Sequence, residues 1–333
     1  MSNKIELTCN ILFSGIGCQE RGIKNTGLFD VKVLSTSDID KEAVVSYAAI
    51  HCGLTPEMID TYNNYPTREE MAQYLTDINL GYNPEKNKPY DWFKLAKRKN
   101  NDINKYWLAC HLSHNKGDIN KIQSLPYADL WTISFCCQDI SVAGKMRGLK
   151  PDSGTRSSLL WENIRLLKTA KENNELPKFL MFENVKNLVS KKFINDFNDL
   201  LAVLDELGFN SYWQVLNAKN CGVPQNRERV FVISIRKDID NGKFEFPKPF
   251  DNGLRLKDVL EDNVDDKFFL SQNTIKRFIS DENTEDALLY DGCQAKRERK
   301  AREYNDFSPS LTARDYKDPR MINENNKKGY IMA

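Results

Sequence analysis

The chain has 333 residues, of which 40% are hydrophobic and 29% charged, and its formal net charge is +1. This length allows one large domain and a small one, and the composition is that of a globular protein. Residues 1–6 are too short and too polar for a signal peptide, and no apolar run approaches the roughly 18 residues that a membrane span needs. The small net charge excludes a polycation, so nucleic acid would have to bind to a local basic face.

The cysteines and histidines argue against both a disulfide framework and a zinc site. The eight cysteines have no regular spacing, which is typical of cytosolic thiols rather than of a disulfide framework. His111 and His114 lie beside Cys110, but no second Cys/His pair stands at zinc spacing. We therefore predict a cytoplasmic protein without a metal site.

Short apolar runs alternate with helical patterns through the first two thirds of the chain. Strands are predicted at residues 6–13, 31–36, 130–135, 179–182 and 230–235, and helices from residue 18 and at 41–50, 159–171 and 193–207. This alternation indicates an α/β fold with a mainly parallel sheet covered on both faces. A doubly wound sheet of this kind binds its ligand at the carboxyl ends of the strands.

Two segments differ from this alternation. Residues 55–116 are polar and rich in asparagine and lysine, and we predict an insertion with some helix. From about residue 237 the alternation stops, so we predict a catalytic domain at 1–237 and a smaller, differently built domain at 238–333. Residues 94–99 and 296–302 are the basic candidates for nucleic-acid contact, although composition alone favours solvated helix surfaces.

A glycine turn and an acidic residue follow the first two strands. Residues 13–17 (FSGIG) follow the first strand, and their glycines allow the backbone to approach a ligand closely. The third glycine of the dinucleotide fingerprint is missing. Asp38 follows the second strand, where a carboxylate can accept hydrogen bonds from ribose hydroxyls. The pair indicates a nucleoside cofactor, or else a tight turn with an exposed aspartate.

Three further motifs follow later strands. Residues 134–139 (SFCCQD) place a cysteine just beyond a buried strand, and the polar segment after it is typical of a loop that closes over a site. A buried structural cysteine is the alternative. Residues 182–185 (FENV) put Glu183 within reach of the same edge, unless it caps a helix. In residues 225–229 (QNRER), Arg227 and Arg229 would point to one side of an extended chain, or be surface charges.

In order and spacing these motifs resemble the DNA (cytosine-5) methyltransferase family. FSGIG resembles its cofactor loop, Asp38 its ribose acid, and residues 117–119 (GDI) the segment that contacts the cofactor adenine. SFCCQDIS resembles the nucleophile motif, FENV the acid motif and QNRER the Q-x-R-x-R motif. Residues 153–162 (SGTRSSLLWE) are closest to the subgroup that includes CpG methylases, and 307–318 (FSPSLTARDYKD) are similar to a late part of the target-recognition domain.

The resemblance, which covers residues 5–237, implies a Rossmann-like, S-adenosylmethionine-dependent methyltransferase from a bacterium or phage, with an incomplete target-recognition domain. Such an enzyme methylates carbon 5 of a flipped-out cytosine in a specific sequence of double-stranded DNA, as in restriction–modification systems. The implied catalytic residues are Cys137, Glu183, Arg227 and Arg229. The implied cofactor-binding residues are Phe13, Gly15, Gly17, Asp38, Ile39, Asp118, Ile119, Cys136 and Leu159. The implied DNA-binding residues are Gln138, Ser141, Lys145, Arg147, Arg156 and Gln225.

The sequence departs from the family pattern at two places. Cys136 occupies the position where the family almost always has proline before the nucleophile. The G-N-S-V-like terminal helix and the arginine-rich motif before it do not occur by Ala333, so we expect a second polypeptide to supply them, or a truncated form. A tRNA cytosine methyltransferase and a non-catalytic subunit are the alternatives, and the long insertion and the LTARDY segment favour DNA over RNA.

Overall fold

The computed structural model describes residues 4–83, 88–98, 102–135 and 159–259, together with short strands at 302–303, 308–309, 321–324 and 327–330. Contacts divide the chain into two compact units, Met1–Gln214 with Val230–Phe244, and Val215–Arg229 with Glu245–Ala333. The domain boundary at residue 237 stays a prediction. Within the described residues, no helix is long and apolar enough to cross a membrane.

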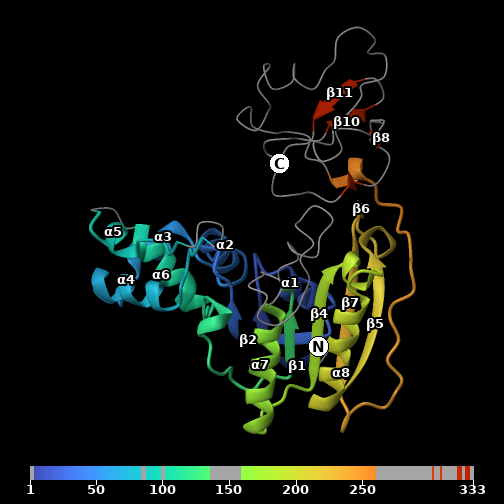
Figure 1. Cartoon of the computed structure of the whole chain (residues 1–333). Coiled ribbons are helices and arrows are strands. Elements are labelled where there is room, and N and C mark those ends of the chain that lie inside the picture. Colours follow the sequence, from blue (N-terminus) through green and yellow to red (C-terminus); the bar gives the residue numbers. More distant parts are fainter. Residues whose placement is uncertain are drawn as a thin grey trace. The chain divides into compact units, whose positions relative to one another are not determined.

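In the described part of the chain, six strands form one sheet in the order β2-β1-β3-β4-β7-β5 (Figure 1). They are β1 (Ile5–Leu12), β2 (Phe29–Ser37), β3 (Leu130–Ile133), β4 (Phe179–Val185), β5 (Phe209–Asn217) and β7 (Glu228–Arg236). β1 pairs in parallel with both β2 and β3, and β3 pairs in parallel with β4. With β1 between β2 and β3, the chain must cross over the sheet, which is the arrangement of a doubly wound fold. The predicted α/β class is confirmed.

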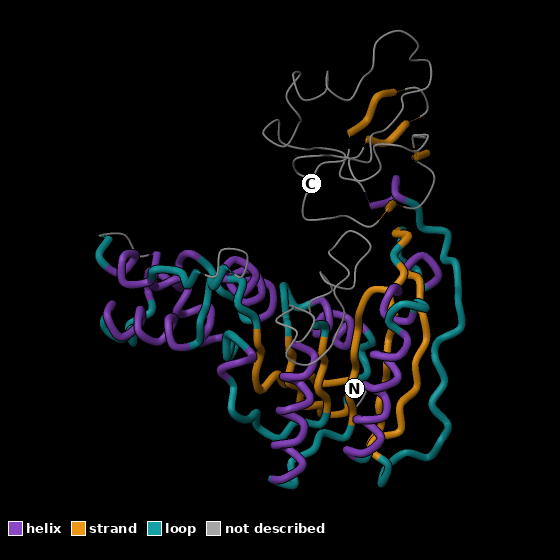
Figure 2. The backbone as a smooth tube through the Cα atoms, viewed as in Figure 1, coloured by secondary structure: helices purple, strands orange, loops and turns teal. Residues whose placement is uncertain are grey.

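The crossover helices are α1 (Cys18–Asn25), α2 (Lys41–His51), α7 (Leu159–Glu172) and α8 (Ile194–Leu207). Figure 2 shows α7 and α8 side by side across one face of the sheet, and the two helices are in contact. α8 buries Phe197, Leu200 and Leu204 at the three- and four-residue spacing of one helix face. Asp40 caps the start of α2, because its carboxylate accepts hydrogen bonds from the backbone N–H groups of Glu42 and Ala43.

Residues 55–116 contain more helix than the sequence predicts. The described residues of this segment form α3 (Pro56–Thr61), α4 (Arg68–Asp77), α5 (Trp92–Ala96) and α6 (Asp102–Leu112), which we call the helical module. Figure 1 shows the module beyond the β2 edge of the sheet. Its buried side chains include Met71, Leu75, Trp92, Ile103 and Leu108, and the same core includes Val44 and Ala48 of α2. Asparagine and lysine separate these buried residues in the sequence, so the sequence pattern underestimates the helix content of the segment.

The strand β5 was not predicted. It is the edge strand of the sheet, and Phe209 is the residue of it that is fully buried. The other residues are half-buried or exposed, so the strand has no apolar run that a sequence pattern could reveal.

The second unit contains short paired strands. β6 (Gln225–Asn226) pairs in parallel with β9 (Ser308–Pro309), and β10 (Met321–Glu324) lies between β11 (Lys327–Tyr330) and β8 (Arg302–Glu303). Its described strands are thus shorter than those of the large sheet, in agreement with the end of the strand–helix alternation.

Asp129 joins three neighbouring strands, because it precedes β3 and contacts Thr8 within β1 and Lys178 just before β4. Its carboxylate accepts hydrogen bonds from the Thr8 backbone N–H and hydroxyl, at 3.1 and 2.6 Å, and lies 2.8 Å from the Lys178 ammonium group. Burial opposes ionisation, but the hydrogen bonds from Lys178 and Thr8 outweigh it and lower the pKa of Asp129 to about 2. The ionised carboxylate therefore stabilises the fold.

We expect Asp129→Asn to lower the free energy of unfolding at pH 7 by roughly 1 to 3 kcal/mol, because charged hydrogen bonds are lost. The difference between wild type and variant, measured by urea unfolding, should shrink as the pH falls from the usual aspartate pKa of about 4 towards 2. Asp205→Asn is the control, because Asp205 and Lys237 form an exposed ion pair at 2.9 Å that should contribute little. A difference that stays constant over this pH range would contradict the assigned role.

Candidate active site

Four neighbouring strands place the predicted site residues at one edge of the sheet. The pairing aligns one row of residues across the strands, namely Ser37, Leu12, Ile133 and Phe182. Directly after this row come the predicted residues Asp38, Phe13 and Glu183. The structure therefore brings the glycine turn, the acidic residue and the FENV motif to a common edge, as parallel strands require.

One side of the glycine turn is closely packed, and the other is not covered by any described residue. Phe13, Gly15 and Gly17 have φ values of 57°, 52° and 86°, in the left-handed region that favours glycine. A Cβ atom on Gly15 would meet no atom of the described residues within 4 Å, so this part of the chain leaves open space beside the Gly15 backbone. A Cβ atom on Gly17 would lie 2.2 Å from the His51 ring. The turn is therefore packed against the His51 ring at Gly17, whereas no described residue covers it at Gly15.

Asp38 is tied to the glycine turn. Its carboxylate accepts hydrogen bonds from the backbone N–H groups of Gly15 and Asp40, both at 2.8 Å. Burial is the largest influence on this carboxyl group, and it raises the pKa of Asp38. A carboxylate offers about four acceptor positions, more than the backbone N–H groups here occupy, so the group can still accept a hydrogen bond from a ribose hydroxyl.

Asn115 holds the backbone of Asp38, and sequence reasoning missed it. The Asn115 side chain accepts from the Asp38 N–H at 2.9 Å and donates to the Asp38 carbonyl at 3.0 Å. Asn115 is only 1% exposed and lies 77 positions away along the chain. Within an asparagine-rich segment, nothing in the sequence distinguishes this residue.

The segment predicted to contact the adenine lies next to the end of β2. Ser37 donates a 2.7 Å hydrogen bond to the Gly117 carbonyl, and the Asp118 carboxylate accepts one from the Asn79 side chain, also at 2.7 Å. Ile119 is buried at the start of η1 (Ile119–Lys121), and its carbonyl accepts a bond from Arg165 of α7. The structure thereby brings Asp118 and Ile119 close to the end of β2, and their contact with the adenine stays a prediction. Leu159 is the first residue of α7, and Ile39 directly follows Asp38.

The end of β3 is held from two sides. The buried Asn184 side chain donates to the Phe135 carbonyl at 3.0 Å, and Gln19 of α1 donates to the Ser134 hydroxyl at 2.8 Å. Glu183, the residue before Asn184, is half-buried. Several predicted site residues follow Phe135 and lie outside the described residues: Cys136, Cys137, Gln138, Ser141, Lys145, Arg147 and Arg156.

The QNRER motif belongs to the second unit. Gln225, Arg227 and Arg229 are partly buried and alternate with the exposed Asn226 and Glu228. This alternation agrees with the expectation that the two arginines point to one side. The Asn217 carboxamide oxygen accepts a 3.0 Å hydrogen bond from the Arg227 backbone N–H. The role of these residues at a base stays a prediction.

Comparisons with known proteins agree with the motifs. Residues 85–331 match the sequence profile of the C-5 cytosine-specific DNA methylases. The chain is 42% identical over 267 residues to the type II methyltransferase M2.ScrFI of Lactococcus lactis subsp. cremoris, covering 79% of this chain and 70% of that protein. It is 34% identical over 264 residues to the orphan methyltransferase M.SssI of Spiroplasma monobiae, covering 78% of this chain and 66% of that protein.

A solved structure shares the fold. The crystal structure of S. pombe Dnmt2 methyltransferase has a TM-score of 0.53 at 16% sequence identity, covering 96% of this chain and 78% of that one. At this identity, the likeness supports the sheet architecture and nothing finer.

Asp38→Asn tests the predicted cofactor site. We expect the Kd for S-adenosylmethionine, measured by calorimetry, to rise roughly 10- to 100-fold, because ribose hydroxyls would lose a charged acceptor. Asp40→Asn is the matched control, since asparagine also caps a helix well and the Kd should stay unchanged. Equal Kd values for Asp38→Asn and wild type would remove Asp38 from the site.

Proposed function

Because the chain belongs to the C-5 cytosine-specific DNA methylase family, we propose that it methylates carbon 5 of a flipped-out cytosine in a specific sequence of double-stranded DNA. The matched segment spans 70% of the Lactococcus relative and 66% of the Spiroplasma relative, so the activity of the whole chain is part of this proposal. The common edge formed by β2, β1, β3 and β4 is the observation that supports it most.

Members of this family use S-adenosylmethionine, which supplies an electrophilic methyl group when it is bound. The open space beside Gly15 and the remaining acceptor capacity of Asp38 fit such a nucleoside cofactor. Asp118 and Ile119 would lie along the adenine, and Phe13, Gly17, Ile39, Cys136 and Leu159 complete the proposed set. The half-buried Asp38 would orient the ribose.

Cys137 is the proposed nucleophile. Carbon 5 of cytosine is weakly nucleophilic until the ring becomes electron-rich, and addition of the Cys137 thiolate to C6 has that effect. After methylation, loss of the C5 proton and elimination of the thiolate would restore the ring and the enzyme. Cys137 follows Ile133 by four residues, and Ile133 pairs with Phe182 beside Glu183. Because both residues follow paired positions of neighbouring strands, this register supports the proposal that the Cys137 thiolate and the Glu183 carboxyl group act on the same base.

Glu183 and the two arginines are the proposed groups for the rest of the base. Glu183 would hold a proton at N3 of the cytosine ring, where negative charge develops on addition of the thiolate. Arg229 would donate to O2, and Arg227 would support the loop or the thiolate. Cationic groups near Cys137 would raise the thiolate fraction.

The target cytosine would have to flip out of the DNA duplex before this chemistry. A stacked cytosine in a duplex cannot be reached, and flipping costs a few kcal/mol. The proposed phosphate contacts are Lys145, Arg147 and Arg156, with Gln138, Ser141 and Gln225 as further DNA-binding residues. Similarity to a protein named type II methyltransferase supports a restriction–modification setting.

The nucleophile can be tested by covalent trapping. DNA with 5-fluorocytosine at the target should form a stable adduct with wild type, because the fluorine at C5 blocks the elimination step. Cys137→Ser should abolish both the adduct and methyl transfer. Cys136→Pro, which restores the residue usual in the family, should keep both. The opposite pattern would assign the nucleophile to Cys136.

Glu183→Gln separates chemistry from cofactor binding. We expect kcat to fall by about 10²- to 10⁴-fold, while the Kd for S-adenosylmethionine stays within a few-fold. Glu206→Gln on the exposed end of α8 is the control and should change neither quantity. A large loss of cofactor affinity in Glu183→Gln, with an unchanged melting temperature, would place Glu183 in the cofactor site instead.

A further inference from the structure

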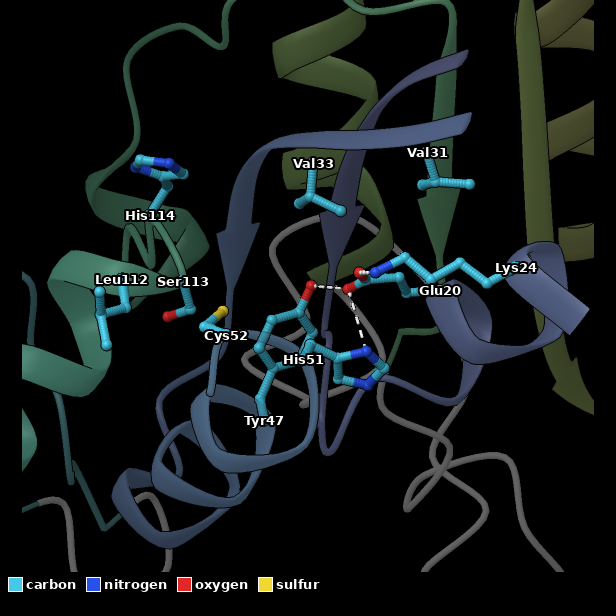
Figure 3. A pocket seen from close by; sticks show the side chains of 10 residues that line it. All are labelled: Glu20, Lys24, Val31, Val33, Tyr47, His51, Cys52, Leu112, Ser113 and His114. Atoms are coloured by element: carbon cyan, nitrogen blue, oxygen red, sulfur yellow. Dashed lines mark hydrogen bonds and ion pairs between the residues drawn. The ribbon is translucent and has the colours of Figure 1, made fainter. Parts of the chain in front are cut away.

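A polar pocket of about 200 Å³ lies beside the Glu20 carboxylate of α1 (Figure 3). It is lined by residues of α1, β2, α2 and the end of α6, and none of them belongs to the proposed cofactor or DNA contacts. Figure 3 shows the Glu20 carboxylate among the side chains of Lys24, Tyr47 and His51. The Tyr47 hydroxyl and the Lys24 ammonium group both donate to this carboxylate.

His51 joins this pocket to the cofactor loop. Its Nε2 atom lies 3.2 Å from the carbonyl oxygen of Ile16. A carbonyl only accepts hydrogen bonds, so Nε2 must carry the hydrogen in this contact. The ring also packs against Gly17, where a Cβ atom would come within 2.2 Å of Nε2. The loop therefore accepts a hydrogen bond from His51 and fits closely against its ring.

The other side of the His51 ring is fixed as well. Nδ1 lies 3.5 Å from a Glu20 carboxylate oxygen, a contact that attracts the ring when Nδ1 as well as Nε2 carries a hydrogen. The Tyr47 ring is tilted against the imidazole with 4.7 Å between centroids. The side chains of His51 and Glu20 are only 3% and 4% exposed. Rotating the ring would break the contacts of both nitrogens, so the position of Nε2 is determined by Glu20 and Tyr47.

The glycine turn is therefore held at two consecutive residues. Asp38 accepts the Gly15 N–H, and His51 donates to the Ile16 carbonyl. Between these points the backbone faces the open space beside Gly15. We propose that His51, oriented by Glu20 and Tyr47, is a positioning residue that keeps the Gly15–Gly17 backbone in the conformation that accepts S-adenosylmethionine. This inference rests on the proposed use of that cofactor.

Two substitutions distinguish the roles of the two ring nitrogens of His51. In His51→Gln the amide N–H group can replace Nε2–H, whereas in His51→Asn the shorter side chain reaches only as far as Nδ1. We expect His51→Asn to raise the Kd and KM for S-adenosylmethionine about ten-fold, the equivalent of one lost hydrogen bond. His51→Gln should stay within about three-fold of wild type by the same reasoning. In both variants kcat at saturating cofactor and KM for DNA should change by less than about two-fold, because the chemical step is untouched.

A control and a measurement on the wild type complete the test. His111→Asn alters an exposed histidine that stacks on Trp107, and it should leave the Kd for S-adenosylmethionine unchanged. Nitrogen NMR of the unliganded wild type, which has three histidines, should show a hydrogen on Nε2 of His51. Equal Kd values for the glutamine and asparagine variants, or a hydrogen found on Nδ1 alone, would overturn the proposal. Wild type that fails to bind S-adenosylmethionine would instead overturn the proposed function, because the NMR result needs no cofactor.

Discussion

The register of the parallel strands is the constraint on which the site depends. Ser37, Leu12, Ile133 and Phe182 form one row of paired residues, so segments far apart in the chain leave the sheet at the same level. Two hydrogen bonds then join neighbouring segments beyond that row, from Gly15 to Asp38 and from Asn184 to Phe135. A slip of one residue in any strand would turn its side chains to the opposite face and break these contacts.

The two sides of the glycine turn are packed differently. No described residue covers the side near Gly15, whose positive φ value is one that glycine adopts without strain. The side near Gly17 has to be supported, and the His51 ring fills the space that a Cβ atom would occupy. Glycine thus provides a left-handed backbone conformation at Gly15, and at Gly17 it also allows close packing against the His51 ring.

Sequence patterns predicted the strands and helices whose apolar residues recur regularly, and the motifs that follow those strands. β5 was missed because an edge strand needs no apolar run, and the helical module was underestimated because polar residues separate its buried ones. Asn115 and His51 carry no local signal of their role. Each acts on a residue distant in sequence, 77 and 35 positions away, and such contacts arise only when the chain has folded.

The helical module shares a hydrophobic core with α2, so it is not an independent surface insertion. Val44 and Ala48 of α2 are buried in that core, whereas Tyr47 and His51 of the same helix face Glu20 and the glycine turn. Asn115, which follows α6, holds the backbone of Asp38. Excising residues 55–116 would therefore uncover the apolar stripe of α2 and remove a support of the acidic residue. In the sequence the segment is an insertion, but in three dimensions it covers α2 and supports the backbone of Asp38.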